Sequence, residues 1–235
     1  MTLDVSKLGT ILGVWAHPDD ETYLSGGIMA LAVRAGQRVV CVTATRGEKG
    51  SQDEVRWPSA TIGSVREKEL ERALGVLGVR EHHWLGYVDG ECDGVDDAEA
   101  AGRLARIVED VAPDTVLTFG PDGQTGHPDH LAVYRWVDAA CPDGEGPAVM
   151  WAAVPDDWRP FAERLDEFDV FAPGTPEFVP RAELDVLLDL DDDLMDLKLG
   201  ALREQPSQTE GLLGALGEEF VRASLSVEAF RRAGG

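Results

Sequence analysis

Basic residues are scarce in this sequence. The chain of 235 residues carries 21 Lys and Arg against 44 Asp and Glu, which gives a formal net charge of −23 at pH 7. A protein this acidic repels phosphate backbones and anionic lipid headgroups. We therefore expect neither nucleic acid nor a membrane as a partner, and we interpret the acidic excess as a well-solvated surface.

Cysteine is scarce as well. The three cysteines, Cys41, Cys92 and Cys141, are odd in number, widely spaced and without a CxxC pair, which argues against a disulfide framework and a Cys-ligated zinc site. No apolar run approaches the ~20 residues of a membrane helix, and the N-terminal segment lacks the charged and apolar parts of a signal peptide. We expect a reducing, cytoplasmic setting.

What the sequence does contain is the composition of an ordinary globular protein. Hydrophobic residues make up 43% and charged residues 28%, so a sizeable buried core is expected. The length suits one domain, and we see no internal repeat or clear linker, so we predict a single domain over 1–235. The sequence does not determine the oligomeric state and leaves a homo-oligomer open.

Strand-like and helix-like segments alternate along the chain. Residues 10–16 and 37–44 are typical of buried strands, and residues 24–35 between them carry apolar positions at helical spacing. Strand, helix and strand within about 35 residues form the βαβ pattern of a parallel sheet. We therefore predict an α/β fold with a mostly parallel sheet.

The pattern is less regular in the C-terminal half. Ser64 and Glu67 have the spacing of a capping box at the start of an amphipathic helix. Seven prolines fall within 142–180, a segment that looks irregular, and the last ~30 residues predict one or two helices. The remaining predicted elements are helices at 64–77, 96–111, 128–140 and 191–204 and strands at 79–86, 114–119 and 148–153.

The first motif with chemical meaning is AHPDDE at residues 16–21, where the first predicted strand ends. Ligands of an open parallel sheet bind outside the carboxyl ends of its strands. His17 and Asp20 are three residues apart, so they can face one point across a turn, and both are good zinc ligands. Asp19 projects elsewhere and could accept a proton from a metal-activated water. Helix capping would explain one Asp, but not the histidine or the second Asp.

The second motif is GHPDH at residues 126–130, which follows a predicted strand and opens a helix. Three of the five histidines fall in these two motifs, which favours convergence on one ion. A catalytic zinc site typically has three protein ligands and one open position. Four candidates, His17, Asp20, His127 and His130, compete for three places, and their spacing does not choose among them.

Together with Gly26-Gly27, TRGEKG at residues 45–50, Arg66 and Asp89, these motifs resemble the PIG-L/LmbE-like zinc-dependent N-deacetylases over most of the chain. The pairing of AHPDDE with HPDH is the specific part. The resemblance implies a Rossmann-like three-layer sandwich. It also implies hydrolysis of a linear amide, the removal of an acetyl group from an N-acetylglucosamine-type amino sugar or a glycosylated metabolite.

The resemblance also implies a metal set and a base. It makes His17, Asp20 and His130 the metal ligands and Asp19 the general base. The implied ion is Zn²⁺, although Fe²⁺ or Co²⁺ suits the same donors.

The resemblance further implies roles around this set. It leaves His127 to stabilise the oxyanion or to protonate the leaving amine, with Asp129 orienting His127. Arg66 and Asp89 match positions that look like sugar-contacting residues.

Two positions depart from the family's pattern. Thr125 stands where the sugar-thiol branch often has a tyrosine, and Gln205 stands where the family often has a histidine. Neither departure changes the metal set, so both bear on the substrate and the rate.

Three other functions compete with amino-sugar deacetylation. One is an amidase that cleaves a larger acyl group from a specialised metabolite or a thiol conjugate. Another is a metal-binding domain without catalysis, against which the intact Asp19 and His127 argue. The third, a Rossmann-like nucleotide-binding enzyme, would need a Gly-rich turn after the first strand, where this chain has His-Pro-Asp-Asp.

A few further residues have less specific patterns. We interpret His82 and His83 as opposite faces of a short strand rather than a second metal site. Trp57, Trp151 and Trp158 lie in loop-like regions, where they could line a substrate cleft.

Overall fold

A seven-stranded sheet forms the centre of the protein. The computed structural model describes residues 4–142, 144 and 146–234, and the strand order is β3-β2-β1-β4-β5-β9-β8. Strands β3 to β5 in this order are parallel, and β9 is antiparallel to both of its neighbours. The strands are β1 (Ile11–Trp15), β2 (Val39–Thr43), β3 (Glu81–Trp84), β4 (Thr115–Thr118), β5 (Ala148–Ala152), β8 (Val186–Asp189) and β9 (Val227–Arg232).

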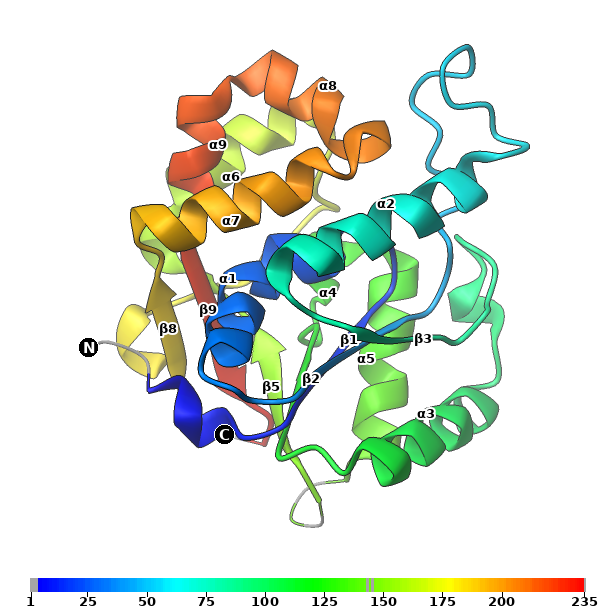
Figure 1. The fold of residues 1–235 in the computed structure, drawn as a ribbon, viewed down its shortest axis with the longest axis vertical. Helices are drawn as coiled ribbons and strands as arrows, with labels where there is room; N and C mark the ends of the chain where they lie inside the picture. The colour runs from blue at the N-terminus through cyan, green and yellow to red at the C-terminus, as the bar shows by residue number, and fades with distance from the viewer. Residues whose placement is uncertain (1–3, 143, 145, 235) are drawn as a thin grey trace.

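Helices cover both faces of this sheet (Figure 1). On one face α1 (Asp20–Arg34) and α2 (Ile62–Leu77) both contact α7 (Asp192–Arg203), and on the other α3 (Asp97–Val111) packs against α5 (Pro128–Ala140). The arrangement is a Rossmann-like three-layer sandwich, and the predicted fold class is confirmed. Every residue of β1 and β2 is buried, which explains why both strands read as continuous apolar runs.

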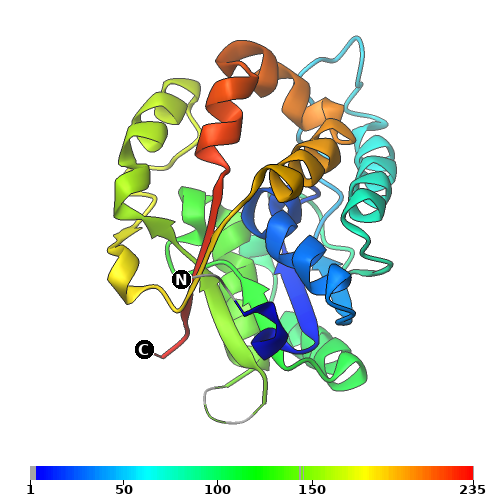
Figure 2. The ribbon, with the colours of Figure 1, turned by 60° about the vertical axis from the view of Figure 1, so that its left-hand side comes forward.

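The C-terminal third adds a cap of helices beyond the sheet (Figure 2). In this cap α6 (Arg159–Leu165) lies beside α9 (Glu218–Ser224), with the rings of Phe161 and Phe220 5.6 Å apart. Helix α8 (Pro206–Leu216) joins α7 to α9. The other elements are α4 (Gly123–Gly126), the paired strands β6 (Val154–Pro155) and β7 (Phe178–Val179), and five short 3-10 helices at Val5–Leu8, Cys92–Gly94, Asp156–Trp158, Asp166–Phe168 and Arg181–Glu183.

Two details of the sequence prediction are wrong. The capping box is absent, because α2 begins at Ile62, ahead of Ser64, and the Glu67 carboxylate accepts a hydrogen bond from Arg46 at 2.8 Å instead. The last residues hold the expected helices α8 and α9 but end in strand β9, which we did not predict. This strand pairs with β5 and β8, so its stability comes from partners distant in sequence.

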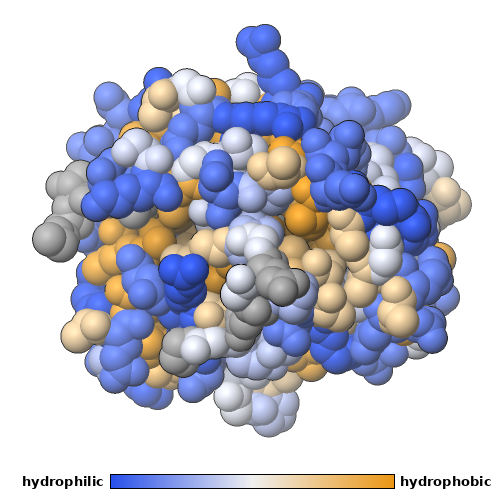
Figure 3. Space-filling view, turned by 90° about the horizontal axis from the view of Figure 1, so that it is seen from below, coloured by the Kyte–Doolittle hydropathy of each residue, from blue (hydrophilic) through white to orange (hydrophobic). Residues whose placement is uncertain are grey.

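Hydrophilic side chains cover much of the face shown in Figure 3, with apolar ones visible between them. Among the described residues, no helix combines the length and hydropathy needed to cross a membrane. The single domain expected over 1–235 includes residues 1–3, 143, 145 and 235, which lie outside the described part.

Candidate metal centre

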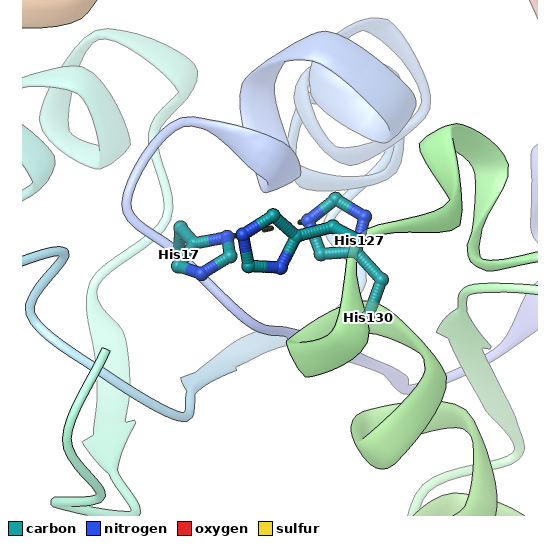
Figure 4. A group of neighbouring side chains, drawn as sticks. All are labelled: His17, His127 and His130. Atoms are coloured by element: carbon teal, nitrogen blue, oxygen red, sulfur yellow. Dashed lines mark hydrogen bonds between the residues drawn. The ribbon is translucent and has the colours of Figure 1, made fainter. Parts of the chain in front are cut away.

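The two sequence motifs meet at the carboxyl ends of β1 and β4, which are neighbours in the sheet. His17 lies in the turn between β1 and α1, whereas His127 caps the N-terminus of α5 and His130 lies in its first turn. Figure 4 shows the three imidazole rings side by side, and their ligand atoms all lie within 4.8 Å of one another. The expected convergence of the motifs is therefore present in the structure.

Two of these histidines, His17 and His130, together with Asp20 bring four donor atoms to the spacing of metal ligands. His17 Nδ1 lies 3.2 Å from His130 Nε2 and 3.6 Å from Asp20 Oδ2, and His130 Nε2 lies 3.5 Å from Asp20 Oδ1. Ligands that surround an ion tetrahedrally at ~2.0–2.2 Å are about 3.3–3.6 Å from one another. The donor set and its spacing therefore fit a zinc-sized cation.

Hydrogen bonds orient both rings toward this point. His17 Nε2 lies 3.1 Å from Asp89 Oδ1 and 3.2 Å from Asp129 Oδ2, and because carboxylates only accept, the proton sits on Nε2. His130 Nδ1 donates to the carbonyl oxygen of Gly123 at 2.9 Å. The lone pairs of His17 Nδ1 and His130 Nε2 thus face each other, an arrangement that a shared cation stabilises.

The electrostatics of the site agree with this geometry. Burial alone would lower the pKa of His17, but the hydrogen bonds of Asp129 and Asp89 outweigh burial and raise this pKa to about 10. Burial lowers the pKa of His130 to about 4, which keeps its imidazole neutral and able to bind a metal. The surrounding carboxylates therefore favour one positive charge at the centre. Without a metal this charge is a proton on His17 Nδ1, and a bound cation would replace that proton.

Asp129 contacts a different histidine from the one we expected. Its carboxylate accepts hydrogen bonds from the backbone N–H groups of Gly90 at 2.7 Å and Cys92 at 3.1 Å and lies against His17. The interaction with His127 is made by the backbone instead, because the Asp129 N–H donates to His127 Nδ1 at 3.1 Å. His127 is thereby the N-cap of α5.

Asp19 is held in an unusual backbone conformation next to this centre. Its φ of 124° is strained for a residue with a side chain. The neighbouring Arg66 donates to the carbonyl oxygen of Pro18 at 2.6 Å and to Asp19 Oδ2 at 3.3 Å. Burial raises the pKa of Asp19 to about 7, although the charge of Arg66 acts in the opposite direction.

Two residues that support Asp19 were missed at the level of sequence. Glu21 accepts a hydrogen bond from the Asp19 N–H at 2.9 Å, and Gln205 Nε2 donates to the same carboxylate at 3.0 Å. Burial raises the pKa of Glu21. Glu21 ends the AHPDDE motif, which was a signal of importance, but no local pattern indicates its contact with Gln205.

Arg66 and Asp89 are more buried than their expected role suggests. Arg66 is 4% exposed and Asp89 is 6% exposed. Arg66 also donates to the carbonyl oxygen of Gly47 at 3.2 Å, while Asp89 accepts from the Lys49 N–H at 2.8 Å and contacts His17. Both residues position other groups of the site, and their contact with a sugar stays a prediction.

A cavity of about 380 Å³ opens onto the centre. Its wall includes Asp19, Asp20 and His130, together with Thr125. Of the three tryptophans that could line a cleft, Trp158 does so, whereas Trp57 and Trp151 are not among the described residues on its wall. The expected short strand at His82-His83 is β3, and His82 Nε2 contacts Thr43 Oγ1 at 2.9 Å.

Comparison with known proteins identifies relatives in sequence and in fold. A family model described as PIG-L, GlcNAc-PI de-N-acetylase, matches residues 12–141. A Mycobacterium sp. (strain KMS) protein named 1D-myo-inositol 2-acetamido-2-deoxy-alpha-D-glucopyranoside deacetylase is 31% identical over 236 residues, covering 84% of this chain and 73% of the relative.

Solved structures share the fold at lower sequence identity. The N,N'-diacetylchitobiose deacetylase from Pyrococcus horikoshii is 22% identical, with a TM-score of 0.67 over 95% of this chain and 83% of that one. The zinc inhibited form of teicoplanin deacetylase Orf2 is 19% identical, with a TM-score of 0.67 over 96% of this chain and 99% of that one.

Proposed function

The chain belongs to the PIG-L family of de-N-acetylases, and we propose that it removes the acetyl group from the nitrogen of an N-acetylglucosamine-type amino sugar with the help of zinc. It is a hydrolase that acts on an amide C–N bond. The observation that carries the proposal is the set of three side chains with donor atoms at metal-ligand spacing, beside the buried carboxylate of Asp19.

We propose His17 Nδ1, Asp20 and His130 Nε2 as the residues that hold the metal. A bound Zn²⁺ would polarise the amide carbonyl and lower the pKa of water to ~7. His₂Asp is also a good donor set for Fe²⁺ or Co²⁺. The carboxylates of Asp89 and Asp129 would fix the ring of His17, as supporting hydrogen bonds do around other metal sites.

Asp19 is the proposed general base. It is adjacent in sequence to Asp20, and its carboxylate pairs with Arg66 at 3.3 Å, whereas the Asp20 carboxylate lies against His17 and His130. A carboxylate with a pKa near the working pH can take a proton from water and release it again. In this role Asp19 accepts the proton as the water attacks the carbonyl carbon, and then returns it to the departing amine nitrogen.

His127 is proposed to hold the carbonyl oxygen. Its Nδ1 accepts the Asp129 N–H, so a neutral ring carries its proton on Nε2. Burial lowers the pKa of His127, which favours this neutral form. A neutral imidazole can donate a hydrogen bond to the developing oxyanion but has no extra proton to give to the amine, so Asp19 is the better candidate for that transfer.

Metal analysis combined with a chemical assay tests the proposal. Purified protein should contain about one equivalent of a divalent metal, and it should release amine and acetate from N-acetylated amino sugars. Chelation should abolish this release, and added Zn²⁺ should restore it. Metal-loaded protein that hydrolyses none of a panel of acetylated amino sugars would contradict the proposed function.

A further inference from the structure

The wall of the cavity beside the metal centre is mixed in character. Its polar side chains include Gln52, Gln124 and Gln208. The part that the C-terminal cap contributes is mostly apolar. Its residues include Leu165, Phe171, Leu212, Leu216, Val221 and Leu225.

The apolar part has no use in the removal of an acetyl group alone. An acetyl group adds one methyl to the carbonyl, whereas the cavity encloses about 380 Å³, a volume within the ~300–1,000 Å³ of pockets that enclose whole ligands. An apolar wall next to a catalytic centre contributes to binding only when an apolar group covers it. The substrate must therefore carry such a group on one side of its amide.

The position of the catalytic residues indicates which side. Asp19, which returns the proton to the amine in the proposed mechanism, lines the cavity, and His127, which holds the carbonyl oxygen, does not. The nitrogen of the amide therefore faces the cavity, together with the sugar attached to it. The glutamine side chains on the wall suit sugar hydroxyls, so the apolar part that the cap contributes lies where a substituent of the sugar would extend.

We propose that the substrate is an N-acetylated amino sugar whose anomeric substituent is an apolar alkyl or aryl group, bound against α8, α9 and Phe171. This inference rests on the proposed function. The curated relative is named for an inositol conjugate, and inositol would place hydroxyl groups against Leu and Val side chains. Hydroxyl groups buried there without hydrogen-bond partners would weaken binding.

A glycoside series tests the proposal. Methyl, octyl and inositol N-acetylglucosaminides of the same anomeric configuration are compared by kcat/KM with zinc-loaded protein. Burial of a few methylene groups predicts that the octyl glycoside exceeds the methyl glycoside by about 10- to 100-fold, mainly through KM. Binding of the same glycosides is measured by titration calorimetry.

A pair of variants localises the effect. Leu212→Trp fills the cavity from α8 and should reduce the octyl-to-methyl ratio of kcat/KM toward one. The matched control, Ala215→Trp, places the same side chain on the exposed side of that helix and should leave the ratio unchanged. The ratio is taken within each protein, so a general loss of folded enzyme cancels.

The outcomes separate this inference from the proposed function. Equal kcat/KM for methyl and octyl glycosides, or preference for the inositol conjugate, would overturn the inference and leave deacetylation intact. A methyl glucosaminide cleaved better with an N-octanoyl than with an N-acetyl group would also overturn it, by placing the chain on the acyl side. Tighter binding of the octyl glycoside without hydrolysis of any amide would support the cavity assignment and reject the proposed function.

Discussion

At the scale of single residues, the site depends on how Asp19 is held. Its φ of 124° costs on the order of 1–3 kcal/mol, and contacts to its main chain and side chain offset that cost. Glu21 accepts its N–H, and Arg66 contacts both its carboxylate and the preceding carbonyl. Asp19 thus pairs with Arg66 while Asp20 contacts His17 and His130, so that neighbouring aspartates can serve as base and ligand.

Replacement of Asp19 tests its role as the base. We expect Asp19→Asn to lower kcat by roughly 10²–10⁴-fold, because an amide cannot accept the proton, while metal content stays at the wild-type value. Amine release and metal analysis measure the two effects. The exposed Asp138→Asn on α5 is the control. Near-full activity of Asp19→Asn would show that another group is the base.

Replacement of Asp129 distinguishes the expected partner from the observed one. Its carboxylate contacts His17, so Asp129→Asn should weaken metal affinity by about 10- to 100-fold, as measured by competition with a chelator. If Asp129 acted mainly through His127, kcat would fall while metal affinity stayed constant, and that result would contradict our assignment.

The sequence predicted the donors of this site better than their supporting contacts. Four candidate donors were identified from the sequence, namely His17, Asp20, His127 and His130. Each pair is three residues apart in a motif that follows a predicted strand. The contact of Asp129 with His17 could not be predicted. It depends on hydrogen bonds that the Asp129 carboxylate accepts from the backbone N–H groups of Gly90 and Cys92, which are distant in sequence.

At the scale of secondary-structure elements, strand β9 anchors the helix that carries the site. Glu228 on β9 accepts hydrogen bonds from the Gly27 and Ile28 N–H groups in the middle of α1, at 2.7 and 2.8 Å, and pairs with Lys198 of α7 at 2.8 Å. Both charged side chains are fully buried. A Cβ on Gly27 would lie 2.1 Å from Leu190, so glycine is required for this close approach.

Removal of one member of this ion pair should destabilise the fold strongly. We expect Lys198→Met to lower the free energy of unfolding by about 3–5 kcal/mol, because Glu228 would stay buried without its countercharge. Urea unfolding measures the change. The exposed pair of Arg203 and Glu218 supplies the control, and Glu218→Gln should have little effect. A Lys198→Met protein as stable as wild type would show that Glu228 is satisfied by the α1 amides alone.

The same elements show where sequence-based prediction ended. Strands β1, β2 and β4 were predicted because each is buried on both faces and is a short run of mainly apolar or β-branched residues. The edge strand β3, EHHW, is only partly buried. Strand β9 has the sequence VEAFRR. Its charged Glu228 is buried because Lys198 and two backbone N–H groups of α1 donate hydrogen bonds to the carboxylate. Its identity as a strand therefore depends on contacts with segments far away in the chain.

At the scale of the whole molecule, the proposed metal connects two parts of the sandwich. His17 and Asp20 follow β1, and His130 lies 113 residues from His17. An ion bound by all three would stabilise the folded chain by about 4 kcal/mol when its free concentration is a thousand times its Kd. At 2–4 °C per kcal/mol for a chain of this size, chelation should lower Tm by roughly 8–16 °C, as measured by calorimetry. His130→Ala should have a Tm that no longer responds to zinc. If chelation removes the metal from the wild-type protein and leaves Tm unchanged, the ion does not hold the turn after β1 and the first turn of α5 together.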